Sequence, residues 1–75
     1  MNERTEKLRA AQERAFAKVG AEFTTVDQYA KAVGLGRDET RRLLRGLPRI
    51  GGKVNVFDAA ERVFDELHPR PRRTG

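Results

Sequence analysis

Arginines are the residues with the most evident chemistry in this chain, and four of them crowd into one short segment: Arg37, Arg41, Arg42 and Arg45. Read as a helix from Gly36 to Leu47, the segment turns Arg41, Arg42 and Arg45 toward solvent and Thr40, Leu43 and Leu44 to the opposite side. Like charges at spacings of three and four repel, so the arrangement does little for stability. Guanidinium groups bind phosphate and the edge of guanine in bidentate fashion. The segment therefore predicts contact with DNA, and a merely solvated arginine face is the alternative.

Other kinds of chemistry find little support. The chain has no cysteine and a single histidine, His68, so a thiolate or multi-histidine metal site is not expected. No nucleophile and base stand in a plausible pairing, and 75 residues leave no room for a deep pocket. We therefore expect no enzymatic activity, no metal and no cofactor.

Length and charge narrow the class of protein. The chain of 75 residues predicts one domain, and its net charge of +5 is dominated by arginine. This bias favours a nucleic-acid partner, although a GC-rich genome would produce it without any functional meaning. No apolar run approaches the roughly 18 residues of a membrane span, and the N-terminus is not signal-like. We expect a soluble, cytoplasmic, nucleoid-associated protein of a bacterial host cell, with no membrane partner.

Residues 1–20 predict an N-terminal helix that Gly20 ends. Its thin apolar stripe consists of Leu8, Ala11, Ala15 and Val19. Two interpretations remain open. The helix packs on the domain that follows, or it serves as a docking or dimerisation helix.

A second helix is predicted just before the arginine segment. Residues 21–24 form a brief strand or an extended lead-in, and Thr25 followed by Gln28 gives a capping-box pattern. The apolar residues after this cap recur at helical spacing until Gly34-Leu35-Gly36 breaks the pattern. Helix, glycine turn and arginine-faced helix together predict a helix-turn-helix, whose second helix enters the major groove.

The segment after Pro48 has the pattern of a hairpin. Gly51-Gly52 separates two β-favouring runs, with Arg49, Lys53 and Asn55 as polar residues near the tip. A basic hairpin directly after a recognition helix is typical of a wing that touches the DNA backbone or minor groove. A last helix is then predicted over residues 58–67, capped by Asp58, with Phe57 as a staple. Its apolar face would consist of Ala60, Val63, Phe64 and Leu67.

Residues 68–75 carry two prolines and the arginines Arg70, Arg72 and Arg73. This composition predicts an extended, disordered tail. Either the tail is an electrostatic arm along the phosphates, or it is a frayed terminus without a role.

The order of these elements resembles two families of DNA-binding domains. The matching segments lie between Phe23 and Leu67 and read FTTVDQYAKAVGLGRDETRRLLR, GLP, RIGGKVNVF and DAAERVFDEL. They are similar to phage excisionases (recombination directionality factors) and to the DNA-binding head of MerR-type regulators. Terminase small subunits have a similar layout. The resemblance implies a mostly α fold with a small β-hairpin wing. This is a winged helix-turn-helix over residues 21–67, preceded here by an extra N-terminal helix.

The resemblance also implies which residues meet DNA. They are Arg37, Arg41, Arg42 and Arg45 on the recognition helix and Lys53 at the wing tip. Gly36 replaces the usual Ser or Thr, so a phosphate contact from that hydroxyl is missing. Thr40 stands where an aliphatic residue normally packs, which predicts a less tightly held recognition helix. We expect an excisionase-like protein that binds repeated sites cooperatively, bends double-stranded DNA and directs a site-specific recombinase. A MerR-like or terminase-like DNA-binding role is the alternative. A protein-interaction adaptor with only non-specific DNA affinity is the alternative from another class.

Overall fold

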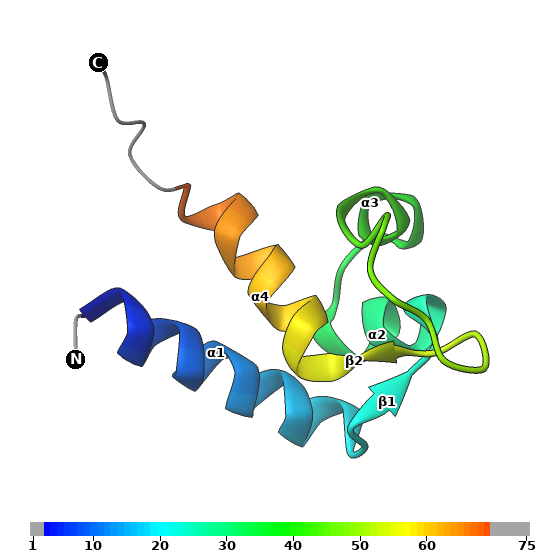
Figure 1. Cartoon of the computed structure of the whole chain (residues 1–75), viewed down its shortest axis with the longest axis horizontal. Helices are drawn as coiled ribbons and strands as arrows, with labels where there is room; N and C mark the ends of the chain where they lie inside the picture. The colour runs from blue at the N-terminus through cyan, green and yellow to red at the C-terminus, as the bar shows by residue number, and fades with distance from the viewer. Residues whose placement is uncertain (1–2, 70–75) are drawn as a thin grey trace.

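The computed structural model describes residues 3–69 and shows four helices and a two-stranded antiparallel sheet (Figure 1). The helices are α1 (Glu3–Val19), α2 (Val26–Val33), α3 (Arg37–Leu43) and α4 (Val56–Leu67), and the strands are β1 (Phe23–Thr24) and β2 (Val54–Asn55). The expectation of a mostly helical fold with a small β element is confirmed at this level. Among residues 3–69, no helix combines the length and the apolar character needed to span a bilayer.

The N-terminal helix α1 packs antiparallel along α4. Arg4 near its start forms an ion pair of 2.7 Å with Asp65 near the end of α4. Phe16 near its end stacks on Phe57 at the start of α4, with ring centroids 5.4 Å apart. Ala15 is buried against the core. Helix α1 thus packs on the rest of the described chain, and Gly20 ends the helix with a φ of 79°.

Helix α2 begins and ends as its sequence indicates. The Thr25 hydroxyl accepts a hydrogen bond of 3.2 Å from the backbone N–H of Gln28. The Gln28 side chain reaches Thr24 instead of returning to the Thr25 backbone, so the capping box is only half formed. Gly34 closes the helix with a φ of 77°, a left-handed conformation that glycine adopts without a steric penalty. Gly34 thus starts the three-residue turn that leads to α3.

Helix α3 is shorter than the predicted helix to Leu47, because it ends at Leu43. Leu44 is completely buried, and the backbone N–H of Leu47 bonds to the Leu44 carbonyl at 3.3 Å in a tighter turn. Gly46, with a φ of 87°, supports this reversal. The predicted helix is longer because Leu44 continues the helical apolar pattern, whereas the expectation that Gly46 stops the helix agrees with its left-handed conformation. Arg45 therefore lies in the turn and not on the helix.

Thr40 contradicts the expectation of a loosely held helix. It is fully buried, and its hydroxyl donates a hydrogen bond of 2.7 Å to the Gly36 carbonyl. The hydroxyl is therefore satisfied within α3, and the remainder of the side chain fills the core.

The hairpin expected around Gly51-Gly52 is present only as a turn. Ile50 and Lys53 exchange two backbone hydrogen bonds of 2.9 and 3.1 Å, and both glycines have positive φ, at 60° and 79°. These are the conformations of a primed two-residue turn. Beyond the turn, β2 pairs with β1 instead of with residues 49–50. Ile50 belongs to the first β-favouring run, and its side chain is 69 % exposed because the turn projects from the core.

Helix α4 begins earlier than predicted. Its N-cap is Asn55, whose side-chain oxygen accepts a hydrogen bond of 3.1 Å from the Asp58 backbone N–H. Asp58 therefore stands inside the first turn, and Phe57 is a helical residue and not a staple preceding the cap. Starting at residue 56 turns Val56 into the core, where it is fully buried. At the other end Leu67, expected on the apolar face, is 70 % exposed because it lies past the last core contact.

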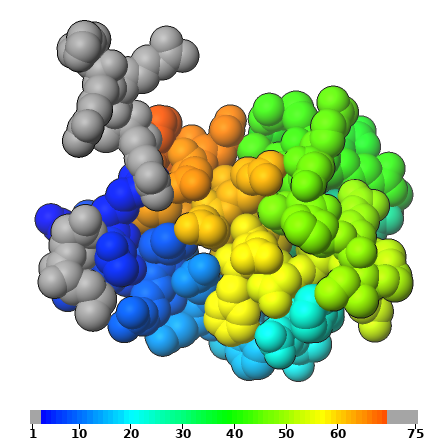
Figure 2. All heavy atoms as spheres, viewed as in Figure 1, coloured from blue at the N-terminus to red at the C-terminus, as the bar shows by residue number. Residues whose placement is uncertain are grey.

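The core lies where α1, α2, α4 and the sheet meet, and Leu44 reaches it from the end of α3. Its largest fully buried side chains are Tyr29, Leu44, Val54, Val56 and Thr40. The core thus fixes the two ends of the segment from Thr40 to Val54. The exposed arginines of that segment therefore lie on a stretch of chain that is anchored at both ends. In Figure 2, residues 37–53 (green) form the end of the molecule opposite the start of α1.

Candidate nucleic-acid interface

An open depression of about 600 Å³ lies between the start of α2, helix α3 and the hairpin turn. Three of the arginines singled out in the sequence line it: Arg41 from α3, Arg45 from the turn after α3, and Arg49 from the segment before the hairpin turn. Gly52 borders the same depression. We call Arg41, Arg45 and Arg49 the basic surface. The fold brings these three cations, which are spread over nine residues of sequence, around one concave region.

One acid, Asp27 on α2, also lies in this depression. Its carboxylate accepts two hydrogen bonds from Arg41, of 3.2 Å from Nε and 3.1 Å from the guanidinium end. Arg37 approaches the same carboxylate at 3.9 Å. The Asp27 side chain is 46 % exposed, so these ion pairs are screened by water and contribute little to stability. They nevertheless hold Arg41 in a defined orientation and cancel part of its charge in the free protein.

Arg42 points to a different group of acids. It bonds to Glu39 at 2.6 Å and approaches Glu66 of α4 at 3.9 Å. The hydrogen bond and the charge of Arg42 lower the pKa of Glu39, and the same contact raises the pKa of Arg42. Both side chains therefore remain charged over a wide pH range. Arg42 is separated from the basic surface, because the depression is not lined by it.

Arg45, Arg49 and Lys53 are exposed and form no ion pair with any residue in the range 3–69. Lys53 stands beside Gly52 at the hairpin turn, with its backbone bonded to Ile50. Because no acid of the described chain neutralises them, these three cations are the ones most available to an anionic partner.

Arg62 is a residue that the sequence analysis missed. From α4 its guanidinium donates hydrogen bonds of 3.2 Å to the Leu43 carbonyl and 3.0 Å to the Arg45 carbonyl. Helix ends leave backbone carbonyls without partners, and a cationic side chain can satisfy them. Arg62 thus fixes the turn that carries Arg45. Only the position of α4 beside α3 reveals this contact, since Arg62 lies seventeen residues beyond Arg45.

The remaining predicted residues are placed differently. The Asn55 side-chain oxygen caps α4, which accounts for this residue without DNA. Arg70, Arg72 and Arg73 lie outside the described residues. Within residues 3–69 no cluster of histidine and acidic side chains is arranged to hold a metal ion.

Comparisons with known proteins add no relative. No family model, no curated protein and no solved structure matches the chain.

Proposed function

We propose that this chain is a small DNA-binding protein in which α2 and α3 act as a helix-turn-helix and the hairpin turn at Gly51-Gly52 acts as a short wing. The single observation that carries the proposal is the convergence of Arg41, Arg45 and Arg49 on one depression between α3 and the hairpin turn. Arg45 and Arg49 have no acid partner in the described chain, so their charge is available to phosphates.

The arrangement supports different roles for the arginines, with some contacting bases and others contacting phosphates. Arg41 is held by Asp27 near the start of α2, and it would read a base edge once α3 enters the major groove. Arg45 and Arg49 lie on the segment between α3 and the hairpin turn and would contact the phosphate backbone. Lys53 would extend the backbone contact at the wing. Arg42 is turned toward Glu39 and Glu66 and would contribute less than the sequence pattern indicates.

The more specific role that we propose is architectural, as in an excisionase. A helix of only seven residues offers few base contacts, so specificity would also come from cooperative binding to neighbouring sites and from bending of the duplex. Such a protein would guide a site-specific recombinase. A small transcription regulator would use the same surface, and the pattern of complexes on DNA separates the two.

A gel-shift experiment on the DNA that flanks this protein's own gene tests the proposal. It uses the full chain, random competitor DNA and two salt concentrations. A ladder of discrete complexes that resists the competitor supports cooperative, sequence-specific binding, and one discrete complex supports a regulator. Smeared binding that the competitor removes would reduce the proposal to a non-specific basic surface.

Asp27→Asn is expected to strengthen binding to random DNA by up to about fivefold at low salt. The change removes the anion that partly neutralises Arg41 and Arg37, an exposed contact worth about 0.2–1 kcal/mol. Fluorescence anisotropy with a labelled random duplex measures the effect. Glu13→Gln on α1 is the control, because it makes the same change in net charge away from the basic surface. Weaker binding in Asp27→Asn, confined to the specific site, would instead assign Asp27 the role of orienting Arg41 for base recognition.

A further inference from the structure

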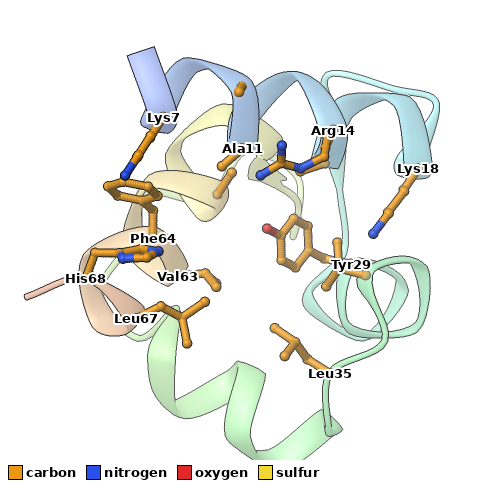
Figure 3. A pocket seen from close by; sticks show the side chains of 14 residues that line it. Lys7, Ala11, Arg14, Lys18, Tyr29, Leu35, Val63, Phe64, Leu67 and His68 are labelled. Carbon is orange, nitrogen blue, oxygen red and sulfur yellow. The ribbon is translucent and has the colours of Figure 1, made fainter. Parts of the chain in front are cut away.

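A second concave region shares no lining residue with the depression at the basic surface, and apolar side chains make up much of its lining. It is a groove of about 400 Å³ between α1, α2 and α4, within the size range of small-molecule sites. Its apolar lining includes Val33, Leu35, Val63 and Leu67, and alanines of α1 let the groove approach the helix backbone (Figure 3). None of the residues of the basic surface lines it.

The polar groups around this groove are unusual because they are nearly all hydrogen-bond donors. Lys7, Arg14 and Lys18 of α1 lie along its rim (Figure 3). Lys7 pairs with Glu3 at 3.1 Å, whereas Arg14 and Lys18 form no ion pair with the described residues. The lining residues include no carboxylate and no side-chain amide. A ligand that satisfies such a rim must itself supply acceptors and negative charge.

Tyr29 provides the second observation. It is only 2 % exposed, and its ring projects from α2 with the hydroxyl directed into the groove (Figure 3). The hydroxyl makes no hydrogen bond with any residue of the described chain. No side-chain nitrogen or oxygen of the described residues is both fully buried and without a partner, so the Tyr29 oxygen is the accessible end of an otherwise buried side chain and can donate to a ligand in the groove. Burial raises the pKa of Tyr29 above its ordinary value, in keeping with a hydroxyl that stays protonated and donates.

We propose that this groove binds a small amphiphilic carboxylate, with the apolar chain against α2 and α4 and the carboxylate between Tyr29, Arg14 and Lys18. Charge excludes the end of this chain as the occupant, because residues 70–75 carry Arg70, Arg72 and Arg73 and would face the cationic rim. The site is separate from the basic surface, so the inference does not depend on DNA binding.

The chain offers a direct reporter for this site. Tyr29 is its one tyrosine, and there is no tryptophan, so tyrosine fluorescence reports on the groove alone. The full chain is titrated with octanoate, with octanol and with octylammonium, each below its aggregation concentration. We expect a saturable change with octanoate, binding at least about tenfold weaker with octanol, and no binding with octylammonium. The tenfold difference corresponds to a loss of the charge-assisted contacts.

Variants test the assigned contacts. Arg14→Gln is expected to weaken octanoate binding by about threefold to tenfold, since one charged donor at a partly exposed rim is lost. Arg9→Gln, the same change on the same helix but away from the groove lining, is expected to have no effect. Tyr29→Phe keeps the ring and removes the hydroxyl. Its weaker binding is measured by calorimetry, because the reporter is gone.

Each opposite result overturns part of the proposal. Equal affinities for octanoate and octanol would remove carboxylate recognition, and no saturable change would remove the site. Equal losses in Arg14→Gln and Arg9→Gln would reduce the effect to net charge. Tighter binding of an acidic amphipathic peptide than of octanoate would reassign the groove to a protein partner. None of these outcomes bears on the gel-shift result, which tests the other face.

Discussion

Replacing both Arg45 and Arg49 by alanine is expected to lower affinity for the specific DNA site by at least about thirtyfold. A hydrogen bond from an arginine to a charged phosphate contributes about 1.5–3 kcal/mol, less where water screens it, and 1.4 kcal/mol is a factor of ten in affinity. If both contact phosphates, the slope of log affinity against log salt also falls by about two. Fluorescence anisotropy over a series of salt concentrations measures both quantities. The fold is expected to remain intact, because both side chains are exposed and form no ion pair in the described chain.

A matched double variant separates the position of the charges from their number. Arg9→Ala with Arg14→Ala removes two exposed arginines of α1, neither of which belongs to the basic surface. This variant has the same net charge as the first one. It is expected to bind the specific site within about threefold of the wild type, because general electrostatic attraction is weak at physiological salt. A large loss here, with little loss in the Arg45 and Arg49 variant, would place the DNA contact on α1.

Local signals in the sequence predicted the first half of the fold well. Thr25 is a good N-cap, and Gly34 is a residue that tolerates the left-handed end of a helix. Gly51-Gly52 likewise specifies its turn by conformational preference alone. These features depend on residues within four positions of one another, so no knowledge of the tertiary structure is needed.

The errors occurred where tertiary contacts decide between local alternatives. Asn55 and Asp58 are both good caps, and Glu61, three residues after Asp58, completes a capping-box pattern that favours Asp58 in the sequence. Pairing of β2 with β1 and a 2.8 Å bond from the Val56 N–H to the Glu22 carbonyl favour the earlier start. The available signal in the sequence was the helical spacing of the apolar residues Val56, Ala59 and Ala60, which extends the apolar face of α4 by one turn toward its start. All three are buried in the structure.

In the candidate site too, the features that the sequence did not predict depend on tertiary contacts. The sequence identified the arginines but not their partners, because an ion pair such as Arg41 with Asp27 joins residues fourteen positions apart. Without these partners the arginines look equivalent. With them, Arg42 is engaged by Glu39 and Glu66, Arg41 is oriented by Asp27, and Arg45 is left without an acid. The groove beside Tyr29 has no sequence signature, since three helices that are distant in sequence contribute to it.

Leu44→Ala is expected to destabilise the protein by about 2–5 kcal/mol. The side chain is completely buried, and its removal loses apolar contacts and leaves a cavity. A chain of this size has a free energy of unfolding of only about 4–11 kcal/mol, so the variant loses a large part of it. Thermal unfolding followed by circular dichroism is expected to show a midpoint lower by about 10–30 °C.

The contrast between Leu44 and Leu67 turns this into a test of the helix boundaries. Both leucines continue an apolar helical pattern in the sequence, yet Leu67 is 70 % exposed. Leu67→Ala is therefore expected to change stability by no more than about 0.5 kcal/mol. Similar losses in the two variants would show that α4 packs through residue 67 and that the turn after α3 is less tightly fixed than its contacts indicate. A loss confined to Leu44→Ala makes burial of Leu44 a main anchor of the turn that follows α3. That burial, together with the Arg62 contacts, then holds Arg45 beside the hairpin turn.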